Sequence, residues 1–345
     1  MRKQLTYTFI VAIASTLLTH ANPGLATPPV APEPQKSDIE ALERSPGWIA
    51  DAAFQRGDCK SLDSHIEKLT ASGERDANGE FELYNATRAL FRSFQIHPSD
   101  MDDVLTRKLE SYERNCPDSS FGPVLRAIAL HGWAWRARGN GYSFQVEPEG
   151  RQLFDERNKS AWQQIESAKV RSARLPVWYE QALWIGADAD ADRATLTKIF
   201  REGIAKFPNY YPLYYAYGRN FVPRWGGTYQ ALDSFVRASV KKHPEGDQLY
   251  ARLYAYFDFQ NGMNPDIFTE SSVSWHRMRS GLELMMSTYP AGKHNQATLL
   301  AEACRAGDGA AYFKWRESVD VAEFWAVTPN GISLEICDAR FRRST

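Results

Sequence analysis

Apolar side chains recur at three- and four-residue spacing along most of this chain, and prolines separate the segments that carry them. Three such stripes contain Leu83, Ala86, Leu90 and Phe94; Val124, Ile128, His131 and Trp135; and Met278, Leu282, Met285 and Tyr289. This spacing places the apolar residues on one face of an α-helix. Proline cannot continue a helix because it lacks the amide donor, so Phe207-Pro208, His243-Pro244 and Tyr289-Pro290 mark helix ends. Sustained two-residue alternation is missing, and the pattern predicts an all-α protein.

The helices between Pro176 and Val319 pair into four hairpins. Their boundary prolines, Pro176, Pro208, Pro244 and Pro290, are 32, 36 and 46 residues apart. The first two spacings match the tetratricopeptide period, and the third fits the same unit with an insertion. We therefore predict a right-handed, tetratricopeptide-like solenoid of helical hairpins over residues 141–345. A less regular helical region, residues 38–140, precedes it, and the sequence leaves open whether the two form one array or two lobes.

The first 26 residues have the build of a secretory signal peptide. Arg2 and Lys3 are followed by an apolar stretch from Leu5 to Leu18 and by a small-residue site that ends at Ala26. We expect cleavage after Ala26 and a periplasmic or secreted protein. The apolar stretch has about 14 residues, fewer than the roughly 20 that span a bilayer, so we expect no stable membrane insertion after cleavage, with an uncleaved anchor as the alternative. Residues 27–37 contain four prolines and are typical of an extended spacer.

Four cysteines, Cys59, Cys116, Cys304 and Cys337, follow the signal peptide. An even number of cysteines in an exported chain predicts disulfide bonds, for which three connectivities are possible. The pairs Cys59–Cys116 and Cys304–Cys337 are favoured because helical repeats mainly contact their sequence neighbours. Zinc ligation is the alternative, but no close Cys-x-x-Cys or Cys/His spacing supports it.

Charge and motifs restrict the possible functions. Removal of Arg2 and Lys3 with the signal peptide changes the formal net charge from -1 to -3, which does not favour nucleic-acid binding. Asp188, Asp190 and Asp192 alternate as in a calcium loop, but Arg193 and Ile199 stand where such a loop needs glycine and glutamate, so we expect a helix cap instead. No catalytic, metal-binding or cofactor-binding motif is recognisable, and we predict no cofactor.

The strongest candidate for a binding surface is the segment Pro223-Arg224-Trp225-Gly226-Gly227, which follows a helix that contains Tyr214 and Tyr217. Arginine and tryptophan are enriched at binding hot spots, and glycine allows a ligand to approach the backbone. We therefore predict that Arg224, Trp225, Gly226, Gly227, Tyr214 and Tyr217 form the binding surface. The alternative is that the glycines serve a tight turn and that the indole fills a gap between hairpins. His131 lies on an apolar stripe and is expected to be a core residue.

Several stretches together resemble a bacterial family, domain-of-unknown-function family 4034, over roughly residues 80–340. They are 134–139 (Ala-Trp-Arg-Ala-Arg-Gly), 214–219 (Tyr-Tyr-Ala-Tyr-Gly-Arg), the segment 223–227, 249–254 (Leu-Tyr-Ala-Arg-Leu-Tyr), His294-Asn295 and 303–308 (Ala-Cys-Arg-Ala-Gly-Asp). The resemblance implies an all-helical, tetratricopeptide-like fold and brings no activity with it.

These observations predict an exported helical-repeat scaffold that binds a protein or peptide partner and has no identified catalytic activity. Two alternatives belong to other classes. A protein that binds or cleaves cell-wall glycan would use its aromatic side chains as sugar platforms, with a carboxyl group such as Glu147 or Glu180 as the acid. A purely structural or assembly protein would self-associate without a ligand.

Overall fold

The computed structural model describes residues 36–241, 243–262, 266–328 and 332–342. All regular elements in these ranges are helices, and one isolated antiparallel bridge joins Arg75 to Phe81. The all-α prediction is therefore confirmed. The expected signal peptide, residues 1–26, and most of the spacer, residues 27–37, lie outside the described ranges.

The described chain forms two compact units. The first unit contains residues 36–220 and 238–244, and the second contains residues 221–237 and 245–342. The boundary expected between residues 140 and 141 lies inside the first unit, where the helices on its two sides, α7 and α8, pack together extensively.

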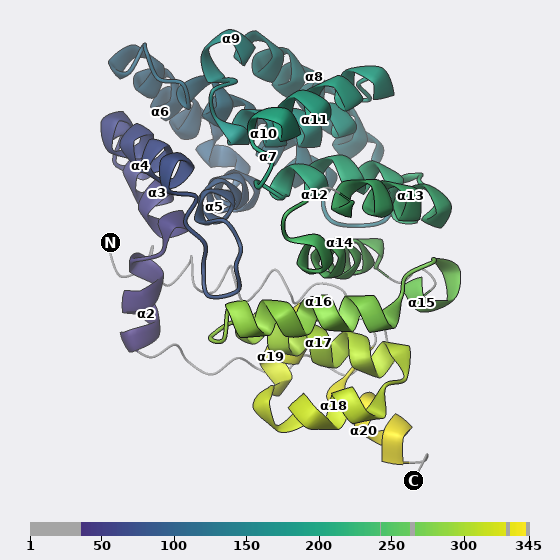
Figure 1. Cartoon of the computed structure of the whole chain (residues 1–345). Helices are drawn as coiled ribbons and strands as arrows, with labels where there is room; N and C mark the ends of the chain where they lie inside the picture. The colour runs from purple at the N-terminus through teal and green to yellow at the C-terminus, as the bar shows by residue number, and fades with distance from the viewer. Residues whose placement is uncertain (1–35, 242, 263–265, 329–331, 343–345) are drawn as a thin grey trace. The chain divides into compact units, whose positions relative to one another are not determined.

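Helices of the first unit pack as successive neighbours (Figure 1). They are α2 (Lys36–Glu43), α3 (Pro46–Gln55), α4 (Cys59–Ser72), α5 (Glu82–Ile96), α6 (Asp102–Asn115), α7 (Gly122–Arg138), α8 (Pro148–Ser167), α9 (Lys169–Ser172), α10 (Pro176–Asp188), α11 (Arg193–Lys206) and α12 (Pro212–Gly218), with short 3-10 turns η1 (Ser99–Met101), η2 (Ser143–Gln145) and η3 (Arg219–Phe221). Helix α5 contacts α3 and α7, and α10 contacts α8, α11 and α12. The apolar stripe from Leu83 to Phe94 is buried, as its spacing predicts.

The second unit contains the C-terminal helices (Figure 1). Its elements are η4 (Pro223–Trp225), α13 (Tyr229–Val240), α14 (Gly246–Asn261), α15 (Ile267–Glu270), α16 (Trp275–Thr288), α17 (Lys293–Ala306), α18 (Gly309–Trp315), η5 (Arg316–Ser318), α19 (Val321–Val327) and α20 (Leu334–Arg342). The last residues of α13, from Ala238, are assigned to the first unit. Helix α16 packs against α14 and α17, and α17 packs against α18 and α19. A core cluster that includes Leu300, Tyr312, Phe324 and Phe341 holds the last four helices together.

The prolines end helices where the sequence predicts. Helices α11 and α16 end immediately before Phe207-Pro208 and Tyr289-Pro290. Helix α13 ends at Val240, before His243-Pro244. Pro46, Pro148, Pro176 and Pro212 instead begin helices. The first turn of a helix has no intrahelical use for an amide donor, so proline is tolerated there.

Each unit contains one disulfide bond. Cys59 is bonded to Cys116 in the first unit, and Cys304 is bonded to Cys337 in the second. This is the pairing that the sequence favours. Both bonds join helices that are close in the chain, as expected for successive hairpins.

Candidate binding site

The segment from Pro223 to Gly227 forms a tight, hydrogen-bonded turn in the second unit. Pro223–Trp225 are a 3-10 helix, and the amides of Trp225 and Gly227 both donate to the carbonyl oxygen of Val222, at 2.9 and 3.1 Å. Gly226 has a φ of 85°, a conformation that favours glycine. A Cβ atom on Gly227 would lie 2.1 Å from the carbonyl carbon of Phe221. Both glycines are therefore required by the turn itself.

The turn presents Arg224 and Trp225 as a pair. The Arg224 guanidinium lies 5.4 Å from the centre of the Trp225 ring, within the range of a cation–π contact, and both residues are half-buried. The Arg224 amide donates to Oδ1 of Asn261 at 3.3 Å, and Nδ2 of Asn261 donates to the Tyr229 hydroxyl at 2.6 Å. Asn261, at the end of α14, thus connects the turn to the start of α13.

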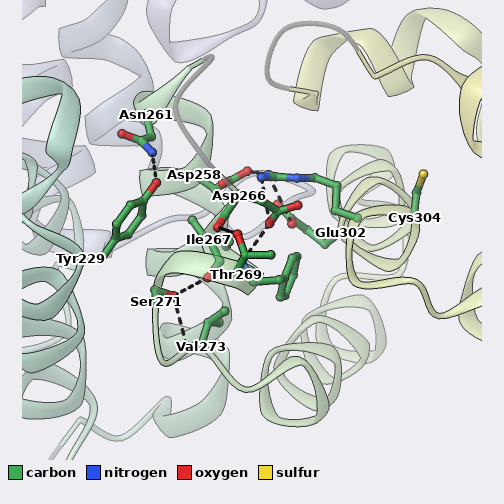
Figure 2. Close-up of polar contacts among 12 residues, drawn as sticks. Tyr229, Asp258, Asn261, Asp266, Ile267, Thr269, Ser271, Val273, Glu302 and Cys304 are labelled. Carbon is green, nitrogen blue, oxygen red and sulfur yellow. Dashed lines mark hydrogen bonds and ion pairs between the residues drawn. The ribbon is translucent and has the colours of Figure 1, made fainter.

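A buried charged centre lies one helical turn before Asn261 on α14 (Figure 2). Its cation is Arg305 on α17, whose guanidinium contacts Asp258, lies 3.3 Å from Asp266 and lies 3.9 Å from Glu302. The side chains of Asp258, Glu302 and Arg305 are 2%, 4% and 7% exposed, so solvent screens these charges little. One buried cation therefore faces three carboxyl groups.

Burial changes the titration of Glu302 and Arg305. Burial, followed by the negative charge of Asp266, raises the pKa of Glu302 to about 8. Burial also lowers the pKa of Arg305 to about 10, which still leaves the guanidinium charged near neutral pH. Glu302 is the carboxyl group farthest from the cation, and at neutral pH it is mainly protonated.

We expect Glu302→Gln to remove part of the pH dependence of stability. A carboxyl group whose pKa rises on folding binds protons more tightly in the folded state, so its contribution is complete below the unfolded pKa, near 4.5, and is lost as the pH rises through about 8. The wild type should lose on the order of 4 kcal/mol from this group between pH 5 and 8.5, and the variant should not. Urea unfolding at both pH values measures this loss, and Glu270→Gln, an exposed carboxyl group in the same unit, is the control. If the wild type and Glu302→Gln lost the same free energy of unfolding between these two pH values, Glu302 would be ionised at both.

Tyr214 and Tyr217 lie in the first unit, on α12, and are 6% and 8% exposed. Their rings pack against Phe200, with centroids 5.3 and 4.4 Å away, and the Tyr217 hydroxyl is 2.7 Å from the Thr197 hydroxyl. Both tyrosines therefore contribute to packing between α11 and α12. Little of either side chain is exposed to a partner. Of the other predicted residues, Gly226 is exposed, and Arg224, Trp225 and Gly227 are half-buried.

A second charged centre, in the first unit, contains residues that the sequence does not connect. Oδ2 of Asp188 accepts hydrogen bonds from Nε2 of His131 and Nε1 of Trp135, both at 2.8 Å. Its Oδ1 lies 2.8 Å from Nη1 of Arg219, whose guanidinium also lies 5.6 Å from the ring of Trp135 and 5.4 Å from that of Trp184. Burial alone would raise the pKa of Asp188, but Arg219, His131 and Trp135 outweigh it and lower the pKa to about 2.

The sequence places His131 on an apolar stripe and assigns it no partner. The structure confirms that it is buried and supplies Asp188 as its partner, 57 positions further along the chain. Of the alternating aspartates, Asp192 is the N-cap of α11 and accepts from the Thr195 amide at 2.9 Å, as the helix-cap interpretation predicts. Asp188 instead ends α10 and faces the buried cation.

The two carboxyl groups considered as glycan-cleaving acids lie in different surroundings. Glu180 is completely buried, accepts a 2.6 Å hydrogen bond from the Tyr210 hydroxyl, and has a pKa that burial raises to about 7. Glu147 is exposed at the start of α8. A cavity of about 200 Å³ in the first unit is lined by Tyr210 together with Leu69, Phe81, Leu83, Pro176 and Phe207, but Glu180 does not line it. A substrate in this cavity would meet mainly apolar walls.

Comparisons of the chain with protein-family models, curated proteins and solved structures find no match. The resemblance to domain-of-unknown-function family 4034 stays a prediction. Among the described residues, no cluster of histidine, cysteine and carboxylate side chains is suited to hold a metal ion. None of the helices in those ranges is both long and apolar enough to cross a membrane.

Proposed function

We propose that this protein is an exported helical-repeat scaffold that binds a protein or peptide partner, and that its hairpins continue as a tetratricopeptide-like solenoid. The successive packing of α3, α5, α7, α10 and α12 in the first unit supports the repeat arrangement. The two disulfide bonds support export, because such bonds persist in oxidising compartments. We place the protein in the periplasm or outside the cell, after cleavage at Ala26.

The observation that carries the binding proposal is the rigidity of the turn that presents Arg224 and Trp225. A preorganised arginine–tryptophan pair loses little conformational entropy when a partner binds, and these residue types dominate binding hot spots. Asn261 holds the turn through the Arg224 amide and belongs to the same helix as the buried Asp258. The half-buried pair is therefore held on a fixed turn rather than on an adaptable loop.

We expect the double variant Arg224→Ala/Trp225→Ala to lose the partner. Crosslinking in living cells, purification from the cell envelope and mass spectrometry would identify a protein that is captured by the wild type. The loss should be at least about tenfold, because each hot-spot side chain typically contributes more than about 1 kcal/mol. Hydrogen exchange of the purified variant reports whether the second unit stays folded.

The matched control is Arg114→Ala/Phe313→Ala, which likewise removes one cation and one aromatic ring, in this case both exposed. It should retain the partner. Arg224→Ala alone leaves the half-buried indole in place and keeps the test informative if the double variant unfolds. Retention of every captured protein by folded Arg224→Ala and double variants would refute the assignment of this surface.

A further inference from the structure

A pair of aromatic side chains, the half-buried Tyr142 and the exposed Phe144, lies in the first unit on the loop that joins α7 to α8. Phe144 is 82% exposed, and its ring is nearly parallel to that of Tyr142, with an interplanar angle of 8° and ring centres 5.9 Å apart. A phenylalanine so exposed forgoes the burial that usually stabilises this side chain. Two parallel rings also present flat apolar surface in a single orientation.

The loop that carries the pair is fixed by hydrogen bonds. The Tyr142 amide donates to Oε1 of Gln145 at 2.9 Å, and the Gln145 amide donates back to the Tyr142 carbonyl at 2.8 Å. Nη1 of Arg138 donates to the carbonyl oxygens of Gly139 and Gly141, at 3.2 and 3.1 Å. Nη2 of Arg151 donates to that of Ser143 at 2.6 Å. Guanidinium groups from both flanking helices therefore hold the loop.

The helices that bear this loop are themselves closely joined. Gly139 has a φ of 72°, which turns the chain sharply at the end of α7. A Cβ atom on Gly150 would lie 2.6 Å from the Ala137 carbonyl oxygen, so the start of α8 lies against the end of α7. Arg138 also lies 5.1 Å from the ring centre of Trp135. The aromatic pair is thus preorganised on a rigid base.

We propose that Tyr142 and Phe144 form a platform on which a pyranose ring of a glycan stacks. A sugar ring has an apolar C–H face that suits a flat aromatic surface, and its hydroxyl groups need polar neighbours. The exposed residues Asn140, Ser143, Gln145 and Glu147 supply such neighbours along the same loop. This site lies in a different unit from the Arg224–Trp225 turn and does not depend on the function proposed for that turn.

Area and charge argue against other occupants. A stable protein partner usually covers about 800 Å² on each side, more than the loop of residues 139–147 offers. An anionic lipid surface would favour a cluster of basic residues, but Glu147 and Glu149 accompany Arg151 here. The two arginines that hold the loop already donate to its carbonyl groups.

The test uses the purified full protein and three defined probes. Calorimetric titration with a β-1,4-linked N-acetylglucosamine hexamer and with a glucose hexamer distinguishes two sugar types, and sedimentation with isolated peptidoglycan tests the polymer. We expect micromolar to millimolar binding of at least one probe. Phe144→Ala and Tyr142→Ala should each weaken that binding about tenfold, whereas Phe144→Trp should retain it.

Phe313→Ala, which removes another exposed phenylalanine, is the matched control and should bind like the wild type. Arg224→Ala/Trp225→Ala should also bind glycan normally, which separates this site from the proposed partner site. The inference is overturned if the wild type binds none of the three probes or if both alanine variants bind normally. Binding to vesicles of anionic phosphatidylglycerol, lost in Phe144→Ala, would identify a lipid occupant and would also overturn it.

Discussion

Replacement of Arg305 by alanine is expected to destabilise the second unit by about 3–5 kcal/mol. The guanidinium contacts Asp258 and Asp266, and Asp258 is only 2% exposed. Removal of the cation leaves a buried carboxylate that must either remain charged without compensation or take up a proton. Urea unfolding measures the loss, and hydrogen exchange of the amides in α14 and α17 should locate it.

The matched control for this variant is Arg277→Ala. Arg277 is also paired with an aspartate of the second unit, Asp247, at 2.6 Å, but these side chains are 38% and 47% exposed. Solvent screens such pairs, so we expect a loss of about 1 kcal/mol or less. If the two variants lost equal stability, the buried pair of α14 and α17 would contribute no more than the exposed pair of α14 and α16.

We expect Asp188→Asn to destabilise the first unit by about 3–5 kcal/mol, because the buried Arg219 loses its counter-charge. Asparagine can still accept hydrogen bonds from His131 and Trp135, so the variant mainly tests the charge.

The lowered pKa of Asp188 gives a second expectation, for the pH dependence of the stability of the first unit. Its stabilising contribution should be complete above the unfolded pKa, near 3.8, and should be lost as the pH falls through about 2. Unfolding experiments across this pH range measure both effects.

Asp192→Asn is the control, four positions further along the chain. It removes a charge of the same sign from an exposed N-cap, where asparagine is as effective as aspartate, so stability should change little. If Asp188→Asn also changed the stability only slightly, solvent would have to replace the carboxylate in stabilising the charge of Arg219. The charge pair would then contribute little to the first unit.

Three of the stretches on which the predicted family resemblance rests contribute Trp135, Arg219 and Arg305 to these two centres. Trp135 and Arg219 come from two stretches and both contact Asp188, which belongs to neither. In the second unit, the Arg224 amide binds Asn261, and Arg305 contacts Asp258 on the same helix. Much of the arginine and tryptophan content that attracts attention in the sequence therefore holds helices together.

Hydrophobic periodicity does not predict which face of the aromatic helix α12 is buried. Every residue from Pro212 to Gly218 is buried, so this helix has no polar face from which an orientation could be predicted. The sequence indicates many aromatic residues at this point, and some of them were expected to line a surface. The burial of Tyr214 and Tyr217 depends on Phe200 of α11, which the sequence does not place beside them.

The sequence by itself determined the all-α class and the helix ends at prolines, and it favoured a helix cap at or near Asp192 and the disulfide pairing that the structure has. These features depend on local backbone chemistry or on contacts between neighbouring hairpins, which periodicity and spacing report directly. Only the tertiary structure decided that His131 and Arg219 share Asp188, that three carboxyl groups share Arg305, and that Phe144 stays exposed. Such pairings join residues far apart in the chain, and no local pattern encodes which side chains the packing of helices brings together.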